Sequence, residues 1–99
     1  MSEEFYFMDG NYVPSSEAKI PVRCHAFLYG TSVFEGIRGY WNEQDNQLYV
    51  FRMKEHIERM FNSAKIMFMD AKYSLDEYLD IIKKLLQKNE YKENCYIRP

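Results

Sequence analysis

Two consecutive stretches with helical spacing most constrain how this 99-residue chain can fold. In the first stretch, apolar side chains recur at steps of three and four, which predicts an amphipathic helix. Its apolar stripe consists of Ile57, Met60, Phe61, Ala64 and Met67. A helix with a single apolar stripe is stable only when another element covers that stripe.

The second helix is predicted to begin after Ser74. The Ser74 hydroxyl can cap the helix while Glu77, three residues later, reaches back to the Ser74 amide in a capping box. Its buried side is expected to consist of Leu75, Tyr78, Ile81, Ile82, Leu85 and Leu86. Both helices therefore need an apolar surface on which to pack.

Segments rich in β-branched and aromatic residues supply that surface. Asp9-Gly10-Asn11 is a turn sequence between residues 5–8 and 12–13, and it predicts a short hairpin. A second hairpin is expected from residues 32–41 and 48–51, joined by a polar turn. Both hairpins imply antiparallel pairing.

A final strand is predicted at residues 95–98. The order hairpin, hairpin, helix, helix, strand predicts an α+β domain, in which two helices pack on one face of a mostly antiparallel sheet. The chain length allows a single domain, residues 1–99, with one modest core.

Charge and composition exclude several classes of protein. Thirteen basic and 15 acidic residues give a net charge of −2, whereas nucleic-acid binding normally needs a basic field. The sequence contains no apolar run of membrane-spanning length. Cys24 and Cys95 lie far apart without a metal-binding spacing, so we expect reduced thiols in a cytoplasmic protein.

The two histidines do not indicate hydrolytic or metal chemistry. His25 and His56 are far apart in sequence, and neither lies in an HExxH pattern, so no metal site is expected. We interpret His25 as a loop residue and His56 as a polar helix residue. Gly30-Thr31-Ser32 precedes a strand rather than a helix, which argues against a phosphate-binding P-loop.

Three arginines are more informative. Arg38 and Arg98 lie on predicted strands next to aromatic residues, and Arg59 lies on the first predicted helix. A guanidinium can bind a carboxylate or a phosphate through two parallel hydrogen bonds. The alternatives are that Arg38 and Arg98 face water and that Arg59 pairs with Glu55, four residues earlier.

Three stretches of sequence resemble one enzyme family. Residues 25–38 (HAFLYGTSVFEGIR) resemble the amino-terminal signature of the branched-chain amino acid aminotransferases, enzymes of fold type IV that use pyridoxal 5′-phosphate. Residues 51–60 (FRMKEHIERM), followed by SAK at 63–65, resemble the next helix of that family, and residues 96–99 (YIRP) resemble the strand that closes its small domain. The similarity extends over practically the whole chain.

The same motifs discriminate among relatives. D-amino acid aminotransferases and aminodeoxychorismate lyases tend to have an acidic Asp-Gly element where this chain has Thr31-Ser32. They also generally lack the FEGIR sequence of residues 34–38. The resemblance therefore favours transfer of amino groups between leucine, isoleucine or valine and 2-oxoglutarate, with D-amino acid or lyase chemistry as an alternative.

The resemblance also implies site residues. Arg59 corresponds to the arginine that binds the cofactor phosphate. The wall of the substrate pocket corresponds to Tyr29, Phe34, Gly36 and Arg38. Tyr96 and Arg98 correspond to the pair that meets substrate carboxylates, and Arg98 would serve the second carboxylate of glutamate.

The lysine that holds the cofactor as a Schiff base lies downstream in the family, in a large domain, and no lysine of this chain stands in that motif. By this resemblance, residues 1–99 are expected to be the amino-terminal small domain of a larger two-domain enzyme that forms a homodimer or a higher homo-oligomer, and to be inactive alone. The alternative is a free-standing, non-catalytic binding module.

Overall fold

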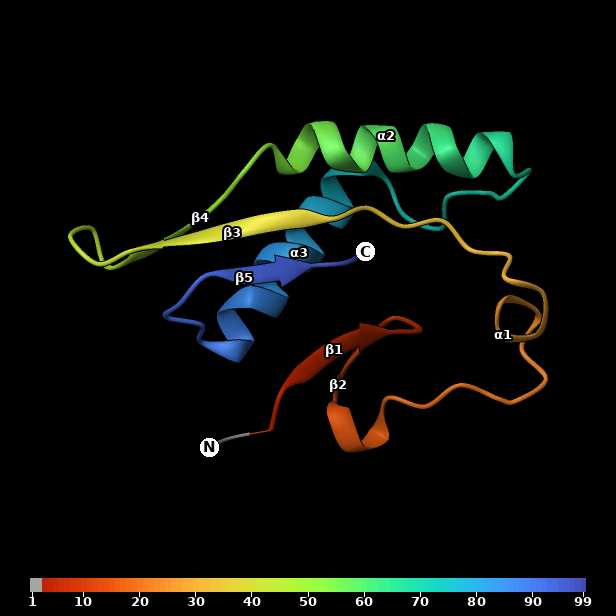
Figure 1. The fold of residues 1–99 in the computed structure, drawn as a ribbon, viewed down its shortest axis with the longest axis horizontal. Helices are drawn as coiled ribbons and strands as arrows, with labels where there is room; N and C mark the ends of the chain where they lie inside the picture. The colour runs from red at the N-terminus through yellow and green to blue at the C-terminus, as the bar shows by residue number, and fades with distance from the viewer. Residues whose placement is uncertain (1–2) are drawn as a thin grey trace.

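The computed structural model describes residues 3–99 and confirms an α+β fold with antiparallel strands (Figure 1). In chain order the elements are β1 (Phe5–Met8), β2 (Asn11–Pro14), the 3-10 turn η1 (Ser15–Glu17), α1 (His25–Tyr29), β3 (Ile37–Asn42), β4 (Gln47–Val50), α2 (Met53–Ile66), α3 (Leu75–Asn89) and β5 (Cys95–Ile97). No helix within residues 3–99 is long and apolar enough to cross a membrane.

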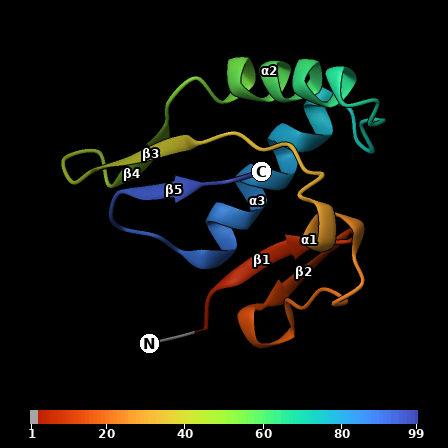
Figure 2. The ribbon, with the colours of Figure 1, turned by 45° about the vertical axis from the view of Figure 1, so that its right-hand side comes forward.

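The strands lie in two sheets instead of the single sheet expected. β1 pairs with β2, while β3 lies between β4 and β5 in a separate three-stranded sheet (Figure 2). In the β3–β5 pair, Ile37 lies opposite Ile97 and Arg38 lies opposite Tyr96. The amino-terminal hairpin is instead tied to α3, because the Asn89 side chain bonds both the N–H and the carbonyl of Phe5.

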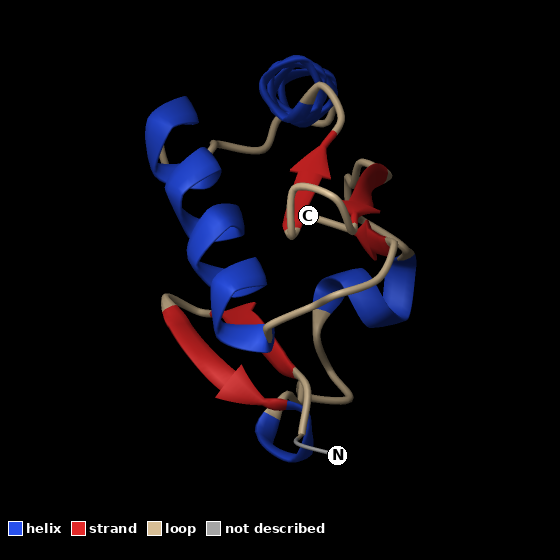
Figure 3. Cartoon of the chain, turned by 90° about the vertical axis from the view of Figure 1, so that its left-hand side faces the viewer, coloured by secondary structure: helices blue, strands red, loops and turns tan. Residues whose placement is uncertain are grey.

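The core lies between the three-stranded sheet and the helices α2 and α3, which lie on the same side of that sheet (Figure 3). Its buried members are Ile37 and Ile97 from the strands, Ile57 and Met60 from α2, and Ile82 from α3. This packing confirms an apolar stripe on α2. Of the six side chains expected on the buried side of α3, only Ile82 is buried, while Leu75, Tyr78 and Leu86 are partly buried against the core.

The start of α3 follows the predicted capping box. The Ser74 hydroxyl accepts a hydrogen bond from the Glu77 amide at 3.2 Å, and the Glu77 carboxylate accepts one from the Ser74 amide at 3.0 Å. The first helix ends one residue earlier than its apolar stripe suggested. Met67 lies beyond α2 and is 45% exposed, because the chain turns at Phe68 with a positive φ of 57°.

The strand expected at residues 32–41 begins only at Ile37, and residues 32–36 form no regular element. The helix α1 lies further upstream, at His25–Tyr29. His25, expected in a loop, is the first residue of α1. Gly30 ends α1 in a left-handed conformation, with φ 69°. Regular pairing of β3 with β5 starts at Ile37, although the Glu35 N–H still donates to the Pro99 carbonyl at 3.2 Å.

Candidate functional site

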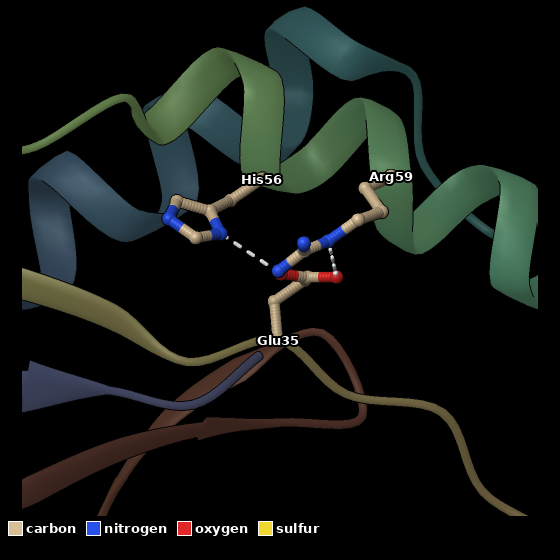
Figure 4. A network of polar contacts seen from close by, with 3 residues as sticks. All are labelled: Glu35, His56 and Arg59. Carbon is tan, nitrogen blue, oxygen red and sulfur yellow. Dashed lines mark hydrogen bonds and ion pairs between the residues drawn. The ribbon is translucent and has the colours of Figure 1, made fainter.

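A buried carboxylate just before β3 and an arginine of α2 form a bidentate ion pair. Glu35, two residues before β3, is only 5% exposed. Arg59 of α2 donates to it through two parallel bonds, from Nε to Oε2 at 2.8 Å and from Nη2 to Oε1 at 2.7 Å (Figure 4). Such a fork fixes the plane of the guanidinium relative to the carboxylate.

His56 completes this group. Its Nδ1 lies 2.8 Å from Oε1 of Glu35, the same oxygen that accepts from Nη2 of Arg59 (Figure 4). An ionised carboxylate can only accept hydrogen bonds, so Nδ1 of His56 must carry the proton. His56 and Arg59 lie three residues apart on α2 and therefore approach Glu35 from the same side of the helix.

The contacts keep Glu35 ionised. Hydrogen bonding to the Arg59 guanidinium, reinforced by His56, lowers the pKa of Glu35 to about 2 even though burial opposes ionisation. In return, the hydrogen bond to Glu35 raises the pKa of Arg59. The site therefore contains a permanent, partly buried ion pair whose cationic member reaches the surface, with 69% of the Arg59 side chain exposed.

These contacts correct two interpretations of the sequence. Arg59 does not pair with Glu55, which instead lies 3.5 Å from Arg52. His56 is not merely a polar helix residue but a hydrogen-bond partner of Glu35. Sequence reasoning did not identify Glu35 as a functional residue, because its partners lie 21 and 24 residues away. The only feature of the sequence that could have singled out Glu35 is its acidic side chain between Phe34 and Gly36, in a segment that is otherwise mainly apolar.

The outward face of β3 and β5 brings together five of the predicted substrate residues. In the extended segment that leads into β3, burial alternates: Glu35 and Ile37 are buried, while Phe34 and Arg38 on either side of them are exposed. The outward group is Phe34, Gly36, Arg38, Tyr96 and Arg98. Within it, the Arg98 guanidinium lies over the Phe34 ring, 4.0 Å from its centroid, in a cation–π contact.

Gly36 has no room for a side chain. A Cβ at this position would lie 2.7 Å from the hydroxyl oxygen of Tyr96 and 3.1 Å from Cε1 of the same ring. The Tyr96 ring therefore lies directly against the backbone at Gly36. Any larger residue would displace this ring, which is 58% exposed on the outward face.

Tyr29 is not part of this group. It lies in α1, which is separate from β3 and β5 in both Figure 1 and Figure 2, and it is 71% exposed. Its ring contacts His25 at a centroid distance of 4.7 Å, and Nδ1 of His25 lies 2.6 Å from the Thr31 hydroxyl. Its predicted place in the substrate wall stays a prediction.

Two further features of the fold bear on the candidate site. A cavity of about 670 Å³ lies between β1, α3 and the end of β5, lined mainly by apolar side chains. Tyr96 and Arg98 of the outward group belong to its described lining, whereas Phe34, Arg38 and Arg59 do not. Within residues 3–99 there is also no cluster of three or more His, Cys, Asp or Glu side chains that could hold a metal ion.

Comparison with known proteins places this arrangement in a family. The model of the class IV aminotransferases matches residues 32–99, which contain β3, α2, α3 and β5. The chain belongs to the class IV aminotransferase family. Its two candidate groups, around Glu35 and on the outward face of β3 and β5, lie almost entirely within the matched residues.

Relatives of this class IV aminotransferase chain are similar along nearly its whole length. A probable branched-chain-amino-acid aminotransferase of Aquifex aeolicus is 48% identical over 99% of the chain and 32% of its own length. The crystal structure of the branched-chain aminotransferase of Thermoproteus uzoniensis with norvaline has a TM-score of 0.91 and 40% identity, over 98% of this chain and 32% of its own.

A third relative is a T.th. branched-chain amino acid aminotransferase complexed with N-(5′-phosphopyridoxyl)-L-glutamate. Its TM-score is 0.88 at 42% identity, over 99% of this chain and 32% of the relative's own. The class IV aminotransferase chain therefore spans about a third of the length of these relatives.

Proposed function

We propose that residues 1–99 form the amino-terminal small domain of a branched-chain amino acid aminotransferase, with a large domain following in the chain. The observation that carries this proposal is similarity at 48% identity along 99% of the chain to a protein about three times as long. The complete enzyme is proposed to be cytoplasmic and to form a homodimer or a higher homo-oligomer. Residues 1–99 alone are expected to be inactive, since they contain no lysine in the family's cofactor-binding motif.

Pyridoxal 5′-phosphate is the cofactor that this proposal requires, and Arg59 is suited to its phosphate. Glu35 uses two of the five N–H donors of the guanidinium, while the others have no partner within residues 3–99. These donors are on a side chain that is largely exposed. When bound, the cofactor supplies an electron sink that lets an amino group pass from an amino acid to a 2-oxo acid.

The outward face of β3 and β5 has the chemistry needed for both substrates. The rings of Phe34 and Tyr96 can contact the aliphatic side chain of leucine, isoleucine or valine. Gly36 is a proposed member of the same wall, because its lack of a side chain lets the Tyr96 ring lie against the backbone there. Arg98 can bind the second carboxylate of glutamate or 2-oxoglutarate. The other proposed members of the wall are Arg38, opposite Tyr96, and Tyr29 from α1.

Visible absorption of the complete reading-frame product with pyridoxal phosphate tests this function. We expect an absorption band of bound cofactor that leucine removes and 2-oxoglutarate restores. Exclusive response to a D-amino acid or to aminodeoxychorismate would instead assign a different reaction to the same fold. If no band forms, or if the reading frame has a natural stop after Pro99, a non-catalytic binding module is the correct interpretation.

Arg98→Ala tests the role of the outward face. In the complete enzyme we expect kcat/KM for 2-oxoglutarate to fall by about ten- to a hundredfold, because a charged hydrogen-bonding partner is lost. The kcat/KM for leucine should fall less, because leucine has no second carboxylate. Arg52→Ala is the matched control, since Arg52 is an exposed arginine paired with Glu55 on another face. Equal losses for the two substrates would contradict the proposed role of Arg98.

A further inference from the structure

Arg59 has an unusual environment for an arginine on a helix surface. Its side chain is 69% exposed, yet the guanidinium is held by two short bonds to a carboxylate that is 5% exposed. An exposed arginine normally samples many rotamers, and fixing one of them costs side-chain entropy. Within the folded domain, the two bonds to Glu35 already hold the Arg59 guanidinium in one orientation.

The carboxylate that holds Arg59 is itself immobilised. Both oxygens of Glu35 accept hydrogen bonds, with Oε1 shared between Arg59 and His56 and Oε2 bound to Arg59 (Figure 4). The backbone amide of Glu35 donates to the Pro99 carbonyl, which anchors the residue beside the end of β5. Rotation of the carboxylate would break contacts to two residues of α2 at once.

We propose that Glu35 and His56 are positioning residues, which hold the Arg59 guanidinium so that its remaining N–H donors meet a phosphate in one fixed geometry. Identification of that phosphate as part of pyridoxal 5′-phosphate rests on the proposed function. Neither Glu35 nor His56 needs to touch the ligand. Their contribution is preorganisation, which improves affinity by removing the ordering cost from the binding step.

Two physical effects of Glu35 on phosphate binding have opposite signs. Its negative charge partly neutralises Arg59 and repels a phosphate, so simple electrostatics predicts that its removal strengthens binding. Its two hydrogen bonds orient the guanidinium, so preorganisation predicts that its removal weakens binding. We expect preorganisation to dominate, because a phosphate would approach the exposed side of Arg59, where water weakens its repulsion by Glu35, while the fork is held by a buried group.

His56 permits a precise substitution. In asparagine, the side-chain amide nitrogen lies close to the position of Nδ1 in histidine, so His56→Asn can keep a donor to Oε1 of Glu35. His56→Ala removes that donor and leaves Oε1 bound only to Arg59. A purely packing role for the imidazole would not distinguish the two variants in this way, because both remove the ring.

The test compares the affinities of the complete apoenzyme for pyridoxal 5′-phosphate and for pyridoxal, which lacks the phosphate. The ratio of the two dissociation constants isolates the phosphate contribution from the rest of the site. Arg59→Ala should abolish most of this preference, and Glu35→Gln should lower it by roughly tenfold, as for other partners that orient a ligand-binding group. His56→Ala should lower it, whereas His56→Asn should retain it.

Glu55→Gln is the matched control, because Glu55 lies on α2 and bonds Arg52 instead of Arg59. A Glu35→Gln protein that prefers pyridoxal 5′-phosphate as strongly as the wild type, while Arg59→Ala does not, would overturn the positioning role but leave the proposed function intact. If the wild-type protein shows no preference for the phosphorylated compound, the proposed function itself fails. If Glu35→Gln does not fold, the His56 variants decide, and an unchanged preference in His56→Ala overturns the inference.

Discussion

At the scale of single residues, burial of Glu35 makes the domain sensitive to acid. The carboxylate is charged although it is 5% exposed, because the Arg59 guanidinium and His56 satisfy its oxygens. Removing one member of a buried ion pair is costly, since it leaves the other without a partner. Protonation of Glu35 has the same consequence as removal, because a neutral acid no longer accepts the full fork from Arg59.

The direction of the pH dependence follows from the pKa. In the folded protein the pKa of Glu35 is about 2, below its ordinary value of 4.5, so the unfolded chain takes up a proton at higher pH than the folded one. The stability contributed by Glu35 is complete above about pH 4.5 and is lost as the pH falls towards 2. The free-energy difference between wild type and Glu35→Gln should therefore shrink on acidification.

Urea unfolding of both proteins between about pH 6 and about pH 3 measures this difference. Glu58→Gln, an exposed position on the same helix, is the control and should show no comparable trend. A difference between wild type and Glu35→Gln that stays constant over this range would show that the ion pair does not contribute to stability.

At the scale of elements, α2 illustrates how one helix serves both the core and the site. Ile57 and Met60 turn into the core, and His56 and Arg59 turn towards Glu35. The two sets alternate along the helix, so packing of the first set determines where the second can reach. Disturbance of the apolar stripe should therefore affect stability and also the position of Arg59.

Two isoleucines of α2, one buried and one exposed, test whether the apolar stripe stabilises the domain. Ile57→Ala should destabilise the domain by about 2–5 kcal/mol, because Ile57 is fully buried and its loss leaves a cavity. Ile66→Ala should change stability by less than about 0.5 kcal/mol, because Ile66 is 77% exposed. Chemical denaturation checks both values, and similar losses for the two variants would contradict the packing described for α2.

Prediction from sequence was most successful for the helices and the turns. The apolar spacing of α2 and the capping box at Ser74 and Glu77 depend on residues three or four positions apart. The predicted start of the first strand in the second hairpin was less accurate. It was expected to begin at residue 32 but begins at Ile37, because a strand needs a partner and β5 ends opposite that residue.

At the scale of the whole molecule, the described chain leaves a large apolar surface uncovered. The segment at residues 20–29, which includes α1, carries five apolar side chains that are 54–73% exposed. These are Ile20, Val22, Phe27, Leu28 and Tyr29. Exposed clusters of this kind drive association when nothing else covers them.

The isolated 99-residue chain should therefore self-associate as its concentration rises. Phe27→Ser combined with Leu28→Ser should weaken that association by at least about tenfold, because two large apolar side chains no longer leave water on contact. Sedimentation equilibrium measures the effect. Ile66→Ser is a control at another exposed apolar position, and an equal effect there would show that association does not depend on the segment at residues 20–29.

The sequence by itself determined the two long helices α2 and α3, both hairpins, the α+β class and the family, since each depends on local spacing or on contiguous motifs. Only the tertiary structure decided that the strands form two sheets and that Arg59 binds Glu35 instead of Glu55. The physical reason is separation along the chain. The partners of Glu35 lie 21 and 24 residues away and meet it only after α2 packs beside β3.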